Sequence, residues 1–156
     1  MTYFLIIGSN FRFPVSNVLS GVHALSRYGE VESRSSLYIT EPVGRKYQTG
    51  FVNGAVKYLS DLKPDRLIRV LKEIEKNMGR RFSSAGIHRP LDIDVAAGEA
   101  RIKSDLISIP HPGLPARRFM LLPLCELDPG FPGGEGGETF RELLDRCQDT
   151  SEVVRI

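Results

Sequence analysis

The length, composition and charge of the chain limit what it can be. It has 156 residues, of which 41% are hydrophobic and 26% are charged. These values exclude a disordered chain and a coiled coil, and they predict a single domain over residues 1–156. The net charge of +2 does not by itself predict a nucleic-acid partner. The charge is unevenly distributed along the chain. Residues 1–122 carry 18 Lys and Arg and 11 Asp and Glu, whereas residues 123–156 carry 3 Lys and Arg and 8 Asp and Glu.

The sequence contains neither a recognisable membrane anchor nor an export signal. No apolar run approaches the ~18 residues that a membrane-spanning helix needs, and residues 1–10 lack the basic start and the cleavage site of a signal peptide. Cys125 and Cys147 form no CxxC motif, and no histidine is spaced to join them in a zinc site. We therefore expect a cytoplasmic protein without a membrane partner. The sequence leaves open whether the two thiols lie close together.

Hydrophobic patterning predicts an alternation of strands and helices along the chain. Short apolar runs that end at glycine or proline are typical of buried strands. Apolar residues at helical spacing follow Pro14 and Pro64, and proline favours the first turn of a helix. We expect strands over residues 2–7, 31–39, 51–59 and 91–97, and a short element over 107–109. We expect helices that begin at Pro14 and Pro64 and end before Gly29 and Gly79, a third over residues 114–124 that reaches Pro123, and a last one over 139–147.

The order of these elements predicts a fold class. The succession β-α-β-β-α-β resembles a split βαβ plan. We therefore expect an α+β fold, in which a ferredoxin-like antiparallel sheet has helices packed on one face. Because this plan serves many functions, the function has to be argued from side chains.

Asp92 and Asp94 are the sharpest chemical feature of the sequence. In a strand, alternate side chains share a face, so the two carboxylates would lie together, with Cα atoms roughly 6.5–7 Å apart. Two carboxylates at that spacing repel each other unless a cation compensates, and Mg²⁺ with phosphate oxygens is the usual compensation. The pattern therefore predicts a metal site. A solvated strand face that carries two acids fits the spacing equally well.

Basic residues flank the acidic pair. Residues 79–89 contain no acid, and further basic residues follow the pair. Guanidinium groups bind phosphate through two hydrogen bonds and stabilise charge in phosphoryl transfer. The cluster therefore predicts a phosphate site, with a solvated basic loop as the alternative. Its members are Arg80, Arg81, His88, Arg89, His111, Arg117 and Arg118.

Phe51 and Asn53 form a third candidate group. As residues i and i+2 of a strand, they share a face, where one offers a flat apolar surface and the other an amide. That combination suits a planar heterocycle, and Phe119 could stack on the other side of the ring. Each phenylalanine considered singly is more often a core residue.

Several segments together resemble the 6-hydroxymethyl-7,8-dihydropterin pyrophosphokinase family, and the match covers nearly the whole chain. The most specific segments are RPLDID at residues 89–94, similar to the family signature R-x-x-D-[LIV]-D, and IPHP at 109–112 with RRFM at 117–120, similar to its P-H-P…R-x-F-M segment. Further segments that resemble the family are GSN at residues 8–10, TEPVG at 40–44, FVN at 51–53, and Ile74-Glu75 followed by Gly79-Arg80.

The resemblance implies a reaction and its ligands. The β,γ-diphosphate of ATP would pass to the hydroxymethyl group of the dihydropterin, giving AMP and the pterin diphosphate in folate biosynthesis. Two Mg²⁺ ions and ATP are the implied cofactor and co-substrate. A monomer that binds small molecules and no nucleic acid is also implied.

The resemblance also implies a role for each matching residue. Asp92 and Asp94 would hold the two Mg²⁺ ions, and Arg80 and Arg89 would close over the phosphates, so that these four residues are the implied catalytic set. The implied ATP-binding residues are Glu75, Arg80, Arg89, His111 and Arg117. The implied pterin-binding residues are Thr40, Val43, Phe51, Asn53, Asp92 and Phe119, with the two phenylalanines on opposite sides of the ring.

The chain departs from the family pattern within residues 80–89, a segment that begins and ends with arginine. Family members often carry a Trp and a G-P-R sequence there, whereas this chain has no Trp and reads IHR at residues 87–89. Phe82 stands where the family has a second arginine. Two alternatives therefore stay open beside the active enzyme. One is a degenerate paralogue that binds pterin but transfers slowly, and the other is a ferredoxin-like module that binds RNA or a small effector.

Overall fold

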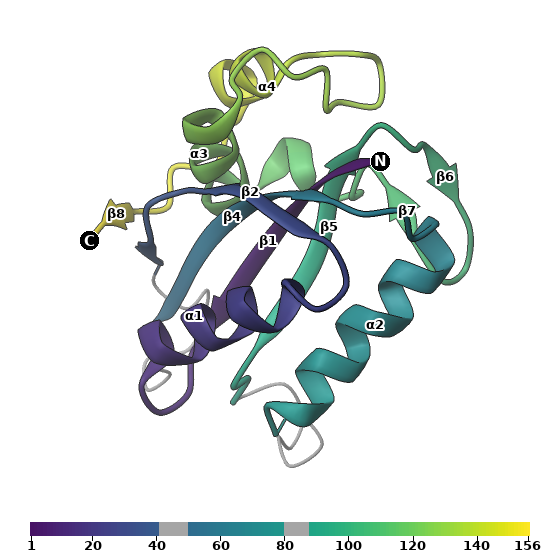
Figure 1. Cartoon of the computed structure of the whole chain (residues 1–156). Coiled ribbons are helices and arrows are strands. Elements are labelled where there is room, and N and C mark those ends of the chain that lie inside the picture. The colour runs from purple at the N-terminus through teal and green to yellow at the C-terminus, as the bar shows by residue number, and fades with distance from the viewer. Residues whose placement is uncertain (41–49, 80–87) are drawn as a thin grey trace.

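The centre of the protein is a six-stranded antiparallel sheet (Figure 1). The structure is a computed structural model, and it describes residues 1–40, 50–79 and 88–156. The strands run in the order β5-β1-β4-β3-β8, and β2 also pairs with β4. Their bounds are Thr2–Ser9 for β1, Glu30–Arg34 for β2, Tyr38–Thr40 for β3, Phe51–Leu59 for β4, Asp92–Gly98 for β5 and Val153–Arg155 for β8. A separate antiparallel pair joins β6 (Ile102–Lys103) to β7 (Ser108–Ile109).

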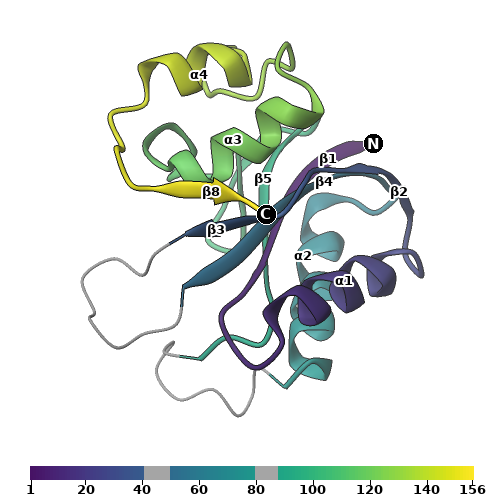
Figure 2. The same cartoon turned by 90° about the vertical axis from the view of Figure 1, so that its left-hand side faces the viewer.

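Helices cover both faces of the sheet (Figure 2). On one face lie α1 (Pro14–Leu25) and α2 (Pro64–Asn77), and on the other lie α3 (Arg118–Leu127) and α4 (Phe140–Arg146). A 3₁₀ turn, Leu114–Ala116, precedes α3. The strand order is that of a ferredoxin-like sheet, so the predicted α+β class is confirmed. The prediction that helices lie on one face only is wrong, because the chain after β5 adds two helices to the other face.

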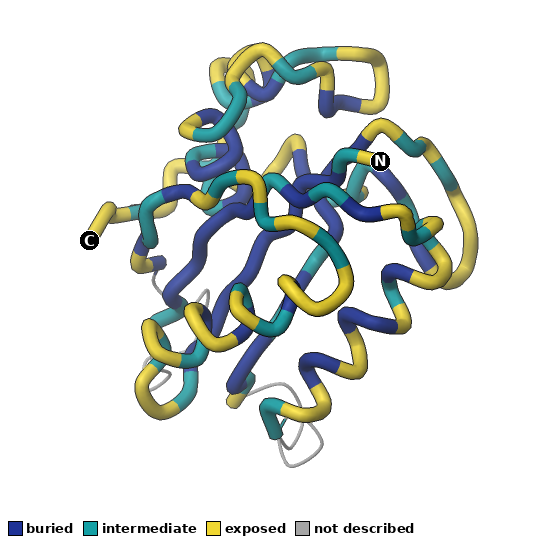
Figure 3. Tube along the Cα trace, viewed as in Figure 1, coloured by how far each residue is buried: buried dark blue, intermediate teal, exposed yellow. Residues whose placement is uncertain are grey.

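The central strand β1 is apolar from Tyr3 to Ile7 because both of its faces are buried (Figure 3). Tyr3, Leu5 and Ile7 contribute to the core under α1 and α2. Phe4 and Ile6 point the other way, into a second core that includes residues of α3 and α4. A strand with only one buried face would alternate apolar and polar residues. The unbroken apolar run at the start of the sequence therefore reflects a sheet between two layers.

The two helices that begin with proline have the predicted bounds. Pro14 and Pro64 occupy first-turn positions of α1 and α2, where the missing N–H of proline costs no helical hydrogen bond. Gly79 follows the end of α2 with a φ of +97°, in the left-handed region that glycine adopts without strain. The buried residues of α2 are Leu67, Val70, Leu71, Ile74 and Glu75, so one face of this helix lies against the sheet.

The segment predicted as one strand over residues 31–39 is two strands, β2 and β3. Ser35 interrupts it, because its hydroxyl accepts a hydrogen bond from Ala55 N at 2.8 Å while its own N–H donates to Ala55 O at 2.9 Å. The serine side chain thus takes the place of a strand carbonyl. Two very short elements, β6 and β8, were not predicted, because two or three residues carry no periodic pattern.

The helix predicted to end at Pro123 continues to Leu127 as α3. A proline inside a helix removes one hydrogen bond and crowds the preceding turn, at a cost of about 3 kcal/mol. In α3, however, Met120, Leu121 and Leu124 are all fully buried. Burying each such side chain contributes roughly 1.5–3 kcal/mol, so packing outweighs the effect of the proline.

Two further features of the sequence can be compared with the structure. Cys125 and Cys147 are both free thiols. Within the described part of the chain, no helix has the length and apolar character needed to cross a membrane.

We predict that Phe4→Ala destabilises the protein by about 3–5 kcal/mol, because it empties the centre of the second core. The Phe4 ring lies 4.6 Å from the Phe131 ring and 5.1 Å from the Phe140 ring, measured between centroids. The measurement is the free energy of unfolding in urea. Phe13→Ala is the control, because the Phe13 side chain is 80% exposed and its loss should change stability by less than about 0.5 kcal/mol. Equal effects of the two substitutions would contradict the assignment of this core.

Candidate active site

The register of three adjacent strands brings the candidate residues together. Gly8 of β1 lies opposite Asn53 of β4 on one side and opposite Asp92 of β5 on the other. Residues that are directly opposite in antiparallel strands point to the same face of the sheet. Asn53 and Asp92, which are 39 positions apart in the sequence, therefore flank one glycine on the face that carries α3.

The Asn53 side chain fills the space beside Gly8, so a residue with a side chain does not fit at position 8. A Cβ added to Gly8 would lie 2.2 Å from Asn53 Oδ1, well inside van der Waals contact. The buried amide of Asn53 donates through Nδ2 to Thr40 Oγ1 at 3.2 Å. Phe51 lies opposite Thr40 in the register of β3 and β4 and is partly exposed. Phe51 and Asn53 both lie on β4 and share a face of the sheet, as their i, i+2 spacing predicts, whereas their binding of a heterocycle stays a prediction.

Asp92 and Asp94 share that face of β5, as the strand period predicts. The pKa of Asp94 is raised above its ordinary value. Burial is the larger cause, and the nearby negative charge of Asp92 is the second. The charges of His111, Arg117 and Lys72 act in the opposite direction. The two carboxylates therefore influence each other in the folded protein, which is the condition that a bound cation relieves.

The donor set at this pair suits Mg²⁺ together with a phosphate ligand. The described residues contain no group of three or more His, Cys, Asp or Glu side chains that could hold a metal. Mg²⁺ is commonly bound by only one or two carboxylates, and water and substrate phosphates complete its octahedron. The residues present therefore fit the ion in the presence of a polyphosphate, with Asp92 and Asp94 as the protein ligands.

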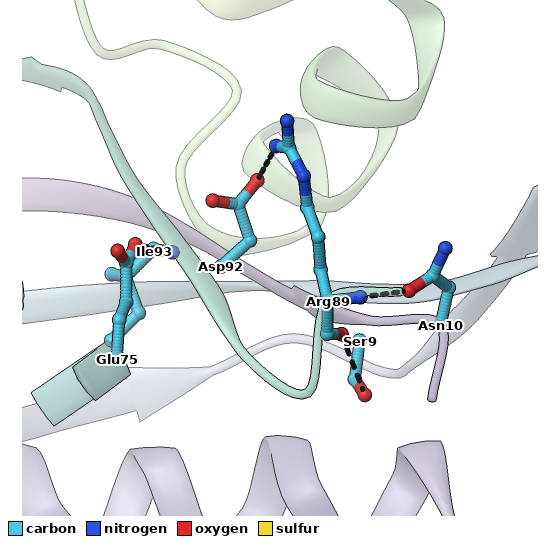
Figure 4. Close-up of polar contacts among 6 residues, drawn as sticks. All are labelled: Ser9, Asn10, Glu75, Arg89, Asp92 and Ile93. Atoms are coloured by element: carbon cyan, nitrogen blue, oxygen red, sulfur yellow. Dashed lines mark hydrogen bonds and ion pairs between the residues drawn. The ribbon is translucent and has the colours of Figure 1, made fainter. Parts of the chain in front are cut away.

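Arg89 is held in place from both its backbone and its side chain (Figure 4). Its N–H donates to Asn10 Oδ1 at 2.6 Å, and its carbonyl accepts from Asn10 N at 3.1 Å. Its guanidinium Nη1 lies 3.1 Å from Asp92 Oδ2. Asn10 thus ties the end of β1 to a residue three positions before the start of β5. Sequence reasoning did not predict this anchor, although the GSN turn contains it.

Glu75 reaches the same strand from α2. Its carboxylate is buried, with the residue only 2% exposed, and Oε1 accepts from Ile93 N at 2.8 Å (Figure 4). Ile93 lies between Asp92 and Asp94, so Glu75 holds the backbone from which both aspartates project. The contact with nucleotide that the family resemblance implies for Glu75 stays a prediction.

His111 has one of its ring nitrogens engaged by the backbone. Nδ1 accepts from Gly113 N at 2.9 Å. The pKa of His111 is lowered below its ordinary value, mainly by burial. The charge of Asp94 raises this pKa and the charge of Arg117 lowers it, both to smaller extents. The neutral ring that accepts at Nδ1 carries its proton on Nε2, so His111 offers an N–H donor.

Arg117 lies beside this histidine. A Cβ added to Gly113 would lie 2.7 Å from Arg117 Nε, so the arginine side chain packs directly over the glycine. Phe119, two residues later, lies in the first turn of α3 and is partly buried against the second core. Arg80 and Val43, which were also predicted as site residues, lie outside the described residues.

A cleft of about 260 Å³ adjoins Asp94. Part of its lining comes from Asp94 and His111, which the sequence predicted. Lys72, Ser104 and Ser108 also line it, and sequence reasoning missed them. Lys72 is one turn of α2 before the buried Glu75, a spacing that places it near the same edge of the sheet.

The arrangement defines a class of protein. It is an α+β domain with paired carboxylates, guanidinium groups and a histidine donor near one end of an antiparallel sheet, a combination suited to a metal-bound polyphosphate. The chain belongs to the 7,8-dihydro-6-hydroxymethylpterin-pyrophosphokinase family, whose model matches residues 4–129. The resemblance inferred from the sequence motifs is therefore confirmed.

Curated relatives carry names from folate synthesis. The 2-amino-4-hydroxy-6-hydroxymethyldihydropteridine pyrophosphokinase of Methylorubrum extorquens is 35% identical over 156 residues, which cover 98% of this chain and 97% of the relative. The protein of the same name from Aquifex aeolicus is 32% identical over 129 residues, covering 82% and 81%. The folate synthesis bifunctional protein of Arabidopsis thaliana is 39% identical over 126 residues, covering 79% of this chain. The chain spans only 26% of the length of that bifunctional protein.

Solved structures of similar fold include HPPK-DHPS from Plasmodium falciparum. The A437G form with STZ-DHP has a TM-score of 0.70 and 16% sequence identity, over 93% of this chain and 45% of that chain. At this identity the similarity supports the fold.

We predict that Asp94→Asn raises the melting temperature of the metal-free protein at neutral pH by about 2–4 °C, corresponding to roughly 1 kcal/mol. The amide removes a carboxylate that is both buried and repelled by Asp92. The measurement is thermal unfolding in the presence of a chelator and then with added Mg²⁺, which should stabilise the wild type more than the variant.

The control is Asp61→Asn, which removes an exposed carboxylate. It should leave both the melting temperature and its response to Mg²⁺ unchanged. A lower melting temperature for metal-free Asp94→Asn than for the wild type would show that Asp94 is stabilised, rather than strained, by its surroundings.

Proposed function

We propose that this protein transfers the β,γ-diphosphate of ATP to the hydroxymethyl group of 6-hydroxymethyl-7,8-dihydropterin. The products are AMP and the pterin diphosphate, and the reaction belongs to folate biosynthesis. The observation that carries the proposal is the register in which Gly8 lies between Asn53 and Asp92. It puts an amide suited to a heterocycle next to a carboxylate suited to a metal-bound phosphate. The family and the names of the full-length relatives agree with this chemistry.

Asp92 and Asp94 are proposed to hold two Mg²⁺ ions. The pair has two carboxylates on one face of β5, and phosphate oxygens of ATP would supply further ligands. When bound, Mg²⁺ neutralises phosphate charge and so favours the attack of a hydroxyl group. Arg89 already compensates part of the charge of Asp92 in the described structure. Its guanidinium is therefore close enough to exchange this carboxylate for a phosphate oxygen.

The pterin is proposed to bind against β3 and β4. Asn53 offers both a donor and an acceptor, and its contact with Thr40 Oγ1 fixes the orientation of its amide. Phe51 and Phe119, both partly exposed, would cover the two faces of the ring. Val43, which lies outside the described residues, would contribute its backbone.

The nucleotide is proposed to bind in the cleft beside Asp94. His111 would donate from Nε2 to a phosphate oxygen, and Arg117 would pair with the phosphates through its guanidinium. Lys72 adds a cation to the lining of this cleft. Arg80 and Arg89 would contact the transferred phosphates, and Glu75 would lie near the nucleotide.

The transfer itself requires no nucleophile from the protein. The pterin hydroxyl oxygen attacks the β-phosphorus of ATP, and the bond from that phosphorus to the bridging oxygen of the α-phosphate breaks. AMP leaves with that oxygen and the electron pair of the broken bond, and the hydroxyl proton passes to water. The contribution of the chain is to align the two substrates and to neutralise charge. This agrees with a site that is rich in charged side chains and held rigidly by the sheet.

We further propose that residues 1–156 form one domain that acts as a monomer in the cytoplasm. Its partners are the two small-molecule substrates, with no nucleic acid and no membrane. Some relatives carry "mitochondrial" in their names, so the compartment is not common to all of them.

We predict that the purified protein releases AMP only when ATP, Mg²⁺ and hydroxymethyl-dihydropterin are all present. Asp92→Asn should lower this rate by several orders of magnitude, because metal ligation stabilises the transition state. Chromatographic separation of AMP from ADP makes the measurement, since simple hydrolysis of ATP at its γ-phosphate gives ADP. Asp61→Asn should retain the wild-type rate. No pterin-dependent AMP from the wild type would refute the proposed function.

We also predict that Gly8→Ala raises the KM for the pterin at least tenfold and changes the KM for ATP much less. The new methyl group would displace Asn53 Oδ1, which lies only 2.2 Å from the Cβ position. Steady-state kinetics with each substrate varied in turn makes the comparison. The matched control is Gly130→Ala, where an added Cβ meets nothing within 4 Å. An unchanged KM for the pterin would mean that Asn53 does not bind it.

A further inference from the structure

The helix that carries part of the proposed site has no capping side chain of its own. Arg117 is the N-cap residue of α3 and makes no side-chain cap hydrogen bond. An oxygen at this position normally accepts one of the first helical N–H groups. The first amide of α3 therefore needs an acceptor from elsewhere in the chain.

Asp149 supplies that acceptor from 31 residues further along the chain. Its Oδ2 accepts from Arg118 N at 3.0 Å. Its Oδ1 accepts from Ser151 N at 2.9 Å and from Ser151 Oγ at 2.6 Å. Both oxygens are thus engaged, and the negative charge lies at the N-terminal end of a helix, where the helix dipole favours it.

The chain after Asp149 then joins the sheet next to the proposed pterin site. The strand β8 pairs with β3, with Val153 opposite Thr40 and Arg155 opposite Tyr38. Val153 is only four positions after Asp149, and a chain of this length spans at most about 14 Å. The segment 149–155 therefore limits the distance between the start of α3 and Thr40.

The C-terminal end of α3 is hydrogen-bonded to the chain at and just before β3. Glu126 Oε1 accepts from Ser36 N and from Ser36 Oγ, both at 2.8 Å, and its Oε2 accepts from Tyr38 OH at 2.5 Å. The helix is consequently attached to the β3 region at its C-terminal end directly and at its N-terminal end through the segment 149–155. Neither Asp149 nor β8 lies within residues 4–129, so membership of the family assigns them no role.

We propose that Asp149 is a positioning residue for the site. By holding the amide of Arg118 while β8 pairs with β3, it sets where Arg117 and Phe119 stand relative to Thr40. These two residues adjoin Arg118 on either side, one proposed for the nucleotide and the other for the pterin. The inference rests on the proposed function for its kinetic consequence, and its structural part stands independently of that function.

The test compares Asp149→Ala, Asp149→Asn and Glu152→Gln in the full chain. Glu152 lies in the same segment and is exposed, so Glu152→Gln matches the loss of charge without the loss of the cap. The first readout is hydrogen exchange at the amide of Arg118, which Asp149→Ala should accelerate at least tenfold. Asp149→Asn keeps one carbonyl oxygen and should give an intermediate rate, and Glu152→Gln should match the wild type.

The second readout is the KM for each substrate, measured well below the melting temperature of every variant. Asp149→Ala should raise both KM values several-fold, whereas kcat should change less. A merely structural role would lower the melting temperature and leave both KM values unchanged, and that result would overturn the proposal. If Asp149→Ala does not fold, Asp149→Asn carries the same comparison.

The two proposals fail in different ways. A wild-type protein that makes no pterin-dependent AMP refutes the proposed function, and the exchange rate at Arg118 then decides the role of Asp149. Unchanged exchange at Arg118 in Asp149→Ala refutes the positioning role even if the wild type is active.

Discussion

The site depends on one constraint, the antiparallel register that puts Gly8 of β1 between Asn53 of β4 and Asp92 of β5. A slip of one residue in either pairing would turn a whole strand over, because side chains alternate between faces. Such a slip would turn the polar residues of the site toward the core under α1 and α2, and it would exchange the side chains of the two cores. The packing of Tyr3, Leu5 and Ile7 on one face and of Phe4 and Ile6 on the other prevents it. The two cores that stabilise the fold therefore also fix the relative positions of the polar groups.

The electrostatics of the site follow from that placement. Asp94 is held near Asp92 in partly buried surroundings, and burial and repulsion raise its pKa. Lys72 of α2, and His111 and Arg117 of the segment between β7 and α3, act against this effect, and Arg89 pairs with Asp92. The small net charge of the chain conceals this arrangement, because the basic surplus lies in residues 1–122 and the acidic surplus in 123–156. Polyphosphate with a divalent cation complements a site that contains fixed charges of both signs.

Periodicity predicted the parts of the site that lie on single strands. Phe51 with Asn53, and Asp92 with Asp94, are i, i+2 pairs, so their common faces follow from strand geometry alone. The helices α1 and α2 were predicted for similar local reasons, from proline, glycine and helical spacing. The contacts of Asn10 with Arg89 and of Asp149 with Arg118 join residues that are 79 and 31 positions apart. No local pattern encodes such pairs. The continuation of α3 through Pro123 was missed because tertiary burial, which a local rule does not include, outweighs the proline.

The position of the proposed metal-binding pair on β5 raises a separate physical problem, because β5 is an edge strand of the six-stranded sheet. Edge strands have backbone groups without a strand partner, and they bend and fray more readily than central ones. At Ile93, between the two aspartates, this is countered by Glu75, which accepts the backbone N–H from a buried position on α2. On the preceding side, Asn10 holds Arg89 through both its N–H and its carbonyl. Glu75 thus takes the place of a neighbouring strand at Ile93, while Asn10 extends the contact between β1 and β5 at Arg89. An edge position combined with local rigidity lets the carboxylates be reached by a large, charged ligand without loss of their alignment.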